Sequence, residues 1–136
     1  MTELKYGILC EQAIINRETG QISIINILNG IRIPKLPIEV NTTSLVLSWQ
    51  RNLNAANADD SFDVRISLRG PGEGAKKRAA NEEFKVKLLK NNTMAHTITH
   101  LKIEFTEAGE NTFIVEKKIG DKWELETTVP IHVIVD

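Results

Sequence analysis

Apolar and polar residues alternate along most of this chain with a period of two, as in β-strands, whose successive side chains point to opposite faces. We expect strands at residues 4–10, 21–28, 43–49, 62–68, 84–88, 97–105, 111–118 and 122–135. The best helix candidate, residues 75–84, is short and follows a glycine-rich loop, so we expect one turn there at most. Turn-separated strands without intervening helices predict an all-β fold, an antiparallel β-sandwich of about eight strands that is immunoglobulin-like or C2-like.

The parity of the apolar residues predicts which side of each strand faces the core. In the first strand, the core side carries Leu4, Tyr6, Ile8 and Cys10. Later strands have inward faces made of Thr43, Leu45, Leu47 and Trp49, of Phe62, Val64, Ile66 and Leu68, of Phe84, Val86 and Leu88, and of Leu101, Ile103 and Phe105. Residues 21–28 are apolar on both faces, which is typical of a central strand covered on both sides. Its two faces carry Ile25 and Ile27 on one side and Ile22, Ile24 and Leu28 on the other, so one set is also a candidate for an outward surface.

The last hairpin allows a prediction of register. Its inward candidates are Phe113, Val115, Trp123 and Leu125, which are all odd-numbered. Because residues opposite each other in an antiparallel pair share a face, odd positions must pair with odd positions. We therefore expect a three-residue loop, 119–121, with Val115 opposite Leu125 and with Gly120 or Asp121 in a left-handed conformation.

Composition restricts the functional classes. A chain of 136 residues, 41% hydrophobic and 26% charged, fits one soluble domain that spans residues 1–136. The net charge of −1 gives no electrostatic reason to expect a nucleic-acid partner. Charges at Glu3, Lys5 and Glu11 interrupt the N-terminal segment, and no apolar run is long enough to span a membrane. The single cysteine, Cys10, cannot form an internal disulfide, so we expect a cytoplasmic protein in which Cys10 is a small core residue rather than a nucleophile.

The segment H-T-I-T-H holds His96 and His100, which have the four-residue spacing of a zinc-binding pair on a helix. The β-branched residues between them indicate a strand instead, where four residues span roughly 13 Å. One zinc ion with bonds of about 2 Å does not easily bridge that distance. Both histidines share the parity of Lys102 and Glu104, so we expect them on the solvent side, at most as the pH-sensitive rim of a binding face.

Two loops carry candidate chemistry. Residues 70–78 resemble a phosphate-binding loop, but Ala75 and Lys77 stand where that motif needs a glycine and a serine or threonine. We expect a flexible connection, with a basic tip for an anionic partner as the alternative; this tip consists of Lys76, Lys77 and Arg78. Asp59 and Asp60 suggest calcium, which needs about six to eight oxygen ligands. Further candidate ligands are Asp63 and Asp121.

Outward apolar residues point to a different role. Ile98, Ile114 and Ile134 have the outward parity of their strands and would form a docking patch if those strands were neighbours. Exposed strand edges offer a second route, by strand addition from another chain. We therefore expect a non-catalytic protein-interaction module, with a protein partner or a second copy in a homodimer, and with no catalytic residue, metal or cofactor. The alternatives are a ligand- or calcium-binding sandwich that uses the loop carboxylates, and a hydrolase whose three histidines, including His132, are brought together by the fold.

Several stretches resemble an uncharacterised family of small bacterial β-sandwich domains of the immunoglobulin-like type. These stretches are Y-G-I-L-C-E at 6–11, G-Q-I-S-I-I-N-I-L-N-G-I at 20–31, L-P at 36–37, F-T-E-A-G-E-N-T-F-I-V at 105–115, and the final V-P-I-H-V. The resemblance covers both ends of the chain but not residues 52–92, and it implies a fold and a bacterial setting without functional residues. Such sandwiches often have an aromatic residue after the G-E pair, where this chain has Asn111, so a tyrosine-corner hydrogen bond is not expected.

Overall fold

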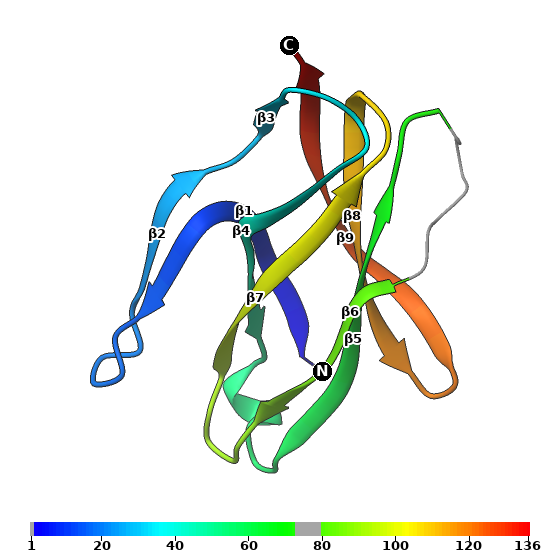
Figure 1. Ribbon diagram of the computed structural model, residues 1–136. Helices are drawn as coiled ribbons and strands as arrows, with labels where there is room; N and C mark the ends of the chain where they lie inside the picture. The colour runs from blue at the N-terminus through cyan, green and yellow to red at the C-terminus, as the bar shows by residue number, and fades with distance from the viewer. Residues whose placement is uncertain (1, 73–79) are drawn as a thin grey trace.

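The computed structural model describes residues 2–72 and 80–136 and contains, within them, nine strands in two sheets and no α-helix (Figure 1). The strands are β1 (Glu3–Ile15), β2 (Ile22–Ile27), β3 (Gly30–Ile33), β4 (Ile38–Gln50), β5 (Asp60–Arg69), β6 (Ala80–Leu88), β7 (Met94–Phe105), β8 (Gly109–Ile119) and β9 (Lys122–Val135), with a short 3₁₀ helix, η1 (Leu53–Ala55). One sheet has the order β2-β1-β4-β7 and the other β3-β9-β8-β5-β6. The expected all-β fold is confirmed.

The ninth strand, β3, makes the second sheet mixed rather than purely antiparallel. It pairs parallel with β9, from Gly30 opposite His132 to Ile33 opposite Val135. The sequence did not reveal this strand because its four residues lie between Asn29 and Pro34, in a stretch with the glycine and proline content of a loop. Residues 73–79 lie outside the described part of the chain, and the rest of the helix candidate, from Ala80, belongs to β6.

The core lies between the two sheets. It is built from the inward faces expected for β4, β5 and β7, and from inward residues of β8 and β9. Trp49 from β4 and Phe62 from β5 join the sheets through an edge-to-face ring contact with centroids 4.9 Å apart. Clean alternation over these strands gave the correct faces because each pairs in regular register where it covers the core.

In β1, the expected inward face is wrong beyond Leu4. A β-bulge between Leu4 and Tyr6 inserts one residue, so Leu4 faces the core while Tyr6, Ile8 and Cys10 pair with outward residues of β4. The core positions that follow are Gly7, opposite Leu47, and Leu9, which is 1% exposed and lies opposite Leu45. Cys10 is buried nevertheless, on the outer side of its sheet.

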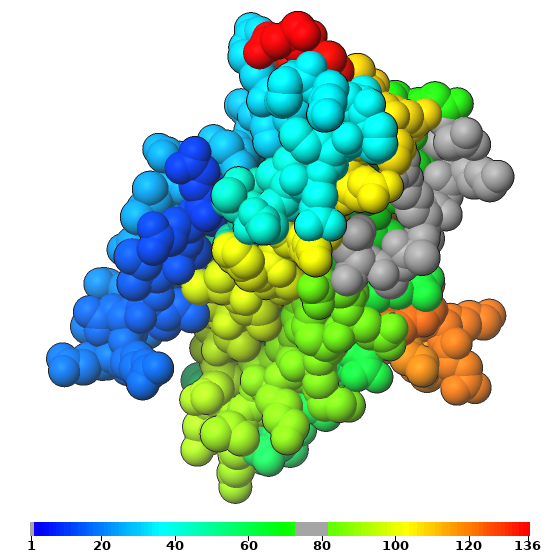
Figure 2. Space-filling view, in the orientation of Figure 1, coloured from blue at the N-terminus to red at the C-terminus, as the bar shows by residue number. Residues whose placement is uncertain are grey.

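Strand β2 is an edge strand, not the central, doubly covered strand that its apolar faces suggested. Together with the end of β1 it forms a two-stranded arm, defined here as residues 11–27, which leaves the body of the protein at the left of Figures 1 and 2. Ile25 is 40% and Ile27 65% exposed. Apolar residues on both faces of a strand therefore do not require that both faces are covered; in β2 both are partly exposed.

The β8–β9 hairpin has a two-residue turn, Gly120-Asp121, with Ile119 opposite Lys122, so the expected three-residue loop is wrong. Gly120 has φ +61°, as expected for one of the two turn residues. The parity conflict is resolved farther along, by a β-bulge that leaves Glu126 between the pairs Val115–Thr127 and Glu116–Leu125. Leu125, expected in the core, is consequently 63% exposed.

Asn111 occupies the corner between β7 and β8. Its side-chain Nδ2 donates hydrogen bonds to the backbone oxygens of Glu107 at 3.0 Å and Gly109 at 3.3 Å, and the residue is fully buried. An asparagine thus makes the upstream backbone contact that a tyrosine makes in many sandwich corners.

Candidate interaction face

The outward side of the four-stranded sheet, called here the outer face, presents three rows of side chains that cross β1, β4 and β7. Cross-strand pairing gives the rows Tyr6–Ser48–His96, Ile8–Val46–Ile98 and Cys10–Ser44–His100. Ile27 of β2 lies opposite Cys10 and extends the third row to the sheet edge. An apolar row thus lies between two rows that contain hydroxyl and imidazole groups. The β4 residues of these rows and Cys10 are buried, so the accessible side chains are those of Tyr6, Ile8 and the β7 residues.

The outer face carries no formally charged residue within these rows, whereas charged residues border it. Glu3 and Lys5 lie at one end, and Lys102 pairs with Glu39 at 3.7 Å at the other. The outward side of the five-stranded sheet has the opposite character. Its strands are linked by Arg65–Glu116 at 2.9 Å and by further charged side chains. An uncharged centre with a charged rim is the composition of a protein-binding surface.

The two histidines lie on the outer face, on the side that the sequence predicted. His100 Nδ1 shares a 3.2 Å hydrogen bond with Ser44 Oγ. In the equivalent row, Ser48 Oγ and His96 Nδ1 are buried and have no hydrogen-bond partner among the residues that the structure describes. Ile98 separates the histidines along the strand, and no three His, Cys, Asp or Glu side chains of the described residues gather as a metal site would require.

A hollow of about 640 Å³ lies where the arm joins the outer face. Its lining consists of Glu11, Gln12, Ile25, Asn41, Thr42 and His100. Apart from Glu11 and Ile25, these residues offer neutral hydrogen-bonding groups. The hollow therefore adds polar contacts next to the apolar row.

The three isoleucines expected to form a docking patch do not meet. Ile98 lies on the outer face, but Ile114 and Ile134 belong to β8 and β9 in the other sheet. Ile114 points outward from β8 but is only 6% exposed. The basic tip residues Lys76, Lys77 and Arg78 lie outside the described residues.

The sequence also failed to identify part of the candidate surface. Tyr6 and Ile8 belong to the outer face but were assigned to the core, because no residue type marks the bulge that reverses their parity. Ile25 and Ile27 were one of two candidate sets for an outward face, and the signal for them was that residues 21–28 carry apolar side chains on both faces.

The loop carboxylates considered for calcium are engaged separately. Asp59 Oδ1 accepts the backbone N–H of Lys90 at 2.7 Å, and Asp60 Oδ2 accepts the hydroxyl of Thr2 at 2.5 Å. Asp63 pairs with Lys85 at 3.4 Å across two strands, and Asp121 lies in the β8–β9 turn. These four aspartates do not converge on one point, so they do not supply the ligand number that calcium needs.

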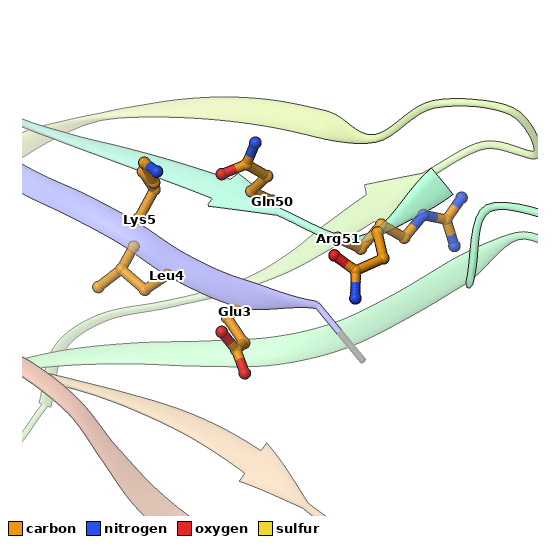
Figure 3. A pocket seen from close by; sticks show the side chains of 6 residues that line it. Glu3, Leu4, Lys5, Gln50 and Arg51 are labelled. Atoms are coloured by element: carbon orange, nitrogen blue, oxygen red, sulfur yellow. The ribbon is translucent and has the colours of Figure 1, made fainter. Parts of the chain in front are cut away.

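A cleft of about 440 Å³ at the start of β1 is lined by Glu3, Leu4, Lys5, Gln50, Arg51 and Asn52 (Figure 3). Lys5 and Gln50 point to the same side of β1 and β4 in this view, whereas Arg51 extends away from them. The Arg51 guanidinium donates to the backbone oxygens of Asn92, Ala58 and Leu89 at 2.8–2.9 Å. These three hydrogen bonds hold the surrounding loops to Arg51.

His132 and Cys10 are two further reactive groups. His132 is exposed on β9, in the sheet opposite the one that carries His96 and His100. Burial raises the pKa of the Cys10 thiol, with a smaller opposing effect from a backbone hydrogen bond with Gln12. A raised thiol pKa disfavours the thiolate that nucleophilic catalysis requires.

The chain matches the family of unknown function DUF6941 over residues 5–134. No curated protein matches it. No helix of the described residues is long and apolar enough to cross a membrane.

Proposed function

We propose that this chain, which belongs to the family of unknown function DUF6941, is a non-catalytic protein-interaction module that binds its partner through the outer face. The observation that carries the proposal is the apolar row Ile8–Val46–Ile98 in the uncharged centre of that face. Val46 is fully buried, so the half-buried Ile8 and Ile98 provide the accessible apolar surface of this row. Burial of apolar area there would supply affinity, and the hydroxyl of Tyr6 and the imidazoles of His96 and His100 would supply orientation.

The contrast between the two outward surfaces supports this assignment. On the five-stranded sheet, the Arg65 guanidinium is bonded to Glu116 and lies 4.4 Å from the centre of the Trp123 ring. Charged groups that already have partners would have to be desolvated by a binding protein, which costs free energy. A partner that binds the central rows of the outer face would have no charged pair to desolvate there.

Strand order supports an immunoglobulin-like sandwich. If β4 to β9 are taken as strands B, C, C′, E, F and G, the five-stranded sheet contains the order G-F-C-C′ and the other sheet contains B next to E. Asn111 then stands at the E–F corner. The buried free thiol of Cys10 and the resemblance of the chain ends to bacterial domains support a bacterial cytoplasmic setting.

The proposal is tested with Ile98→Lys and the matched control Ile134→Lys. Both residues are half-buried isoleucines that point outward from a strand, but from opposite sheets. We expect tagged wild-type protein and Ile134→Lys to retain the same partner on purification from the native host, and Ile98→Lys to lose it while its circular dichroism is unchanged. Retention of the partner by a folded Ile98→Lys would contradict the proposal, as would its loss from both variants.

A further inference from the structure

The connection between β2 and β3 contains the dipeptide Asn29-Gly30, which is the only Asn-Gly pair in the sequence. This connection carries the chain from the four-stranded sheet to the five-stranded sheet (Figure 1). Both residues are exposed, and the side-chain amide of Asn29 forms no hydrogen bond with any residue that the structure describes. An accessible asparagine amide that no hydrogen bond holds is open to reaction with the next backbone nitrogen.

The backbone N–H of Gly30 points away from the sheet. The backbone oxygens of Asn29 and Ile33 accept the N–H groups of His132 and Asp136 at 2.9 Å and 3.0 Å. Alternate residues of a parallel edge strand direct their backbone groups to opposite sides, so the odd-numbered residues of this stretch face β9 and Gly30 faces the other way. On that other side β3 has no neighbouring strand within the described residues. The nitrogen of Gly30 is therefore not engaged in the ladder with β9.

The fold does not account for a glycine at position 30. Among the described residues, the glycines with positive φ are Gly20, Gly109 and Gly120, and Gly30 is not one of them. A β-carbon at position 30 would meet the backbone oxygen of His132 at 3.5 Å, an ordinary van der Waals distance, and no closer atom. Glycine also weakens the interior of a strand. What glycine does provide here is an unhindered approach of its nitrogen to the preceding side chain.

We infer that Asn29 is a site of spontaneous deamidation, with water as the co-reactant. The nitrogen of Gly30 attacks Cγ of Asn29, and an N–Cγ bond forms. The C–N bond of the side-chain amide breaks, and ammonia leaves with the proton that the Gly30 nitrogen gives up. Water then opens the succinimide ring at either carbonyl, which yields aspartate or isoaspartate without any oxidation or reduction. This inference goes beyond the proposed function and does not depend on it.

Isoaspartate at position 29 would alter the start of the β3–β9 contact. It adds a methylene carbon to the main chain and removes from the main chain the carbonyl group that accepts the His132 N–H. β3 has only four residues, and the last of them, Ile33, is 3% exposed in the core. A change at its first pairing position therefore loosens the whole strand from the edge of β9.

The test is mass spectrometry of the full chain during incubation in mildly alkaline buffer, with peptide mapping to locate each amide that becomes an acid. We expect Asn29 to convert before any other described asparagine. Gly30→Ala should slow this conversion by roughly tenfold or more, because the added β-carbon hinders the attacking nitrogen. Hydrogen exchange at His132 and Asp136 should be faster in the aged wild type than in the fresh protein, and should not change on ageing in Gly30→Ala.

The matched control is Asn92→Gly, which creates a second Asn-Gly pair after Asn91. Both positions are exposed, but the backbone N–H of residue 92 donates to the backbone oxygen of Leu89 at 3.0 Å. Because this hydrogen bond holds the nitrogen that would attack, we expect Asn91 to stay an amide in this variant while Asn29 converts.

Three results would overturn the inference. The first is an Asn29 that stays an amide in the folded wild type under conditions in which the urea-unfolded chain converts. The second is an equal rate at Asn29 in the wild type and in Gly30→Ala. The third is conversion of Asn91 in Asn92→Gly as fast as that of Asn29.

Discussion

Ser44 Oγ lies 3.2 Å from His100 Nδ1, across the pair of strands that forms the middle and the edge of the outer face. Serine lies opposite histidine at two places on this face, Ser44–His100 and Ser48–His96. The pair Val46–Ile98 lies between them. The histidine pair that resembles a zinc motif in the sequence therefore borders an apolar row. Its spacing reflects the period of the strand, which brings every second side chain to the same face.

We predict that Arg51→Ala destabilises the fold by about 3 kcal/mol or more, because three backbone oxygens lose a charged donor in a buried site. Urea unfolding measures the loss. Arg32→Ala is the control, since Arg32 forms an ion pair while its side chain is 67% exposed. That change should be within about 0.5 kcal/mol of the wild type. Similar losses in both variants would contradict the role assigned to Arg51.

Lys117 should stabilise the N-terminal segment. Its Nζ donates to the backbone oxygen of Thr2 at 2.6 Å and lies 4.4 Å from the centre of the Phe62 ring. Lys117→Met should lower the free energy of unfolding by about 1–3 kcal/mol and speed hydrogen exchange at the start of β1. Lys118→Met, at the exposed neighbouring position, should do neither. Unchanged exchange at residues 3–5 in Lys117→Met would count against this contact.

Glu126 should make stability depend on pH. Burial raises the pKa of its carboxyl group above the ordinary 4.5, while Lys117 and the backbone N–H of Leu4 oppose the shift. Because the folded state binds this proton more tightly than the unfolded state, stability is lost as pH rises from about 4.5 through the folded pKa. Glu126→Gln removes this loss, so its stability relative to the wild type should increase between pH 4 and pH 7. A difference that stays constant across that range would refute the assignment.

The sequence predicted core faces well where pairing is regular, as at Leu45, Leu47 and Trp49 in β4. It failed at two bulges, near Lys5 in β1 and at Glu126 in β9, because a bulge reverses parity without requiring a particular residue type. For the same reason, the sequence did not predict that Tyr6 and Ile8 belong to the outer face. Strand neighbours are set by long-range pairing, so the sequence did not show that Ile98 lies beside Val46 and apart from Ile114.

Asn111 should be sensitive to the type of replacement. Asn111→Ala removes the Nδ2 donor from the backbone oxygens of Glu107 and Gly109, with an expected cost of about 1–2 kcal/mol. Asn111→Asp keeps the shape but places a carboxylate oxygen beside those acceptors, so it should cost more. Thermal unfolding should give the order wild type, Asn111→Ala, Asn111→Asp. A more stable Asp variant than Ala variant would exclude the hydrogen-bonded corner.

Site-specific photo-cross-linking tests the proposed binding surface most directly. A photoreactive phenylalanine analogue is placed at position 98 in one protein and at position 134 in another, since both isoleucines are half-buried and point outward from different sheets. If the outer face binds the partner, we expect the partner retained by the wild type to be cross-linked from position 98 and not from position 134. Cross-linking from position 134 alone would show that the binding surface is on the five-stranded sheet.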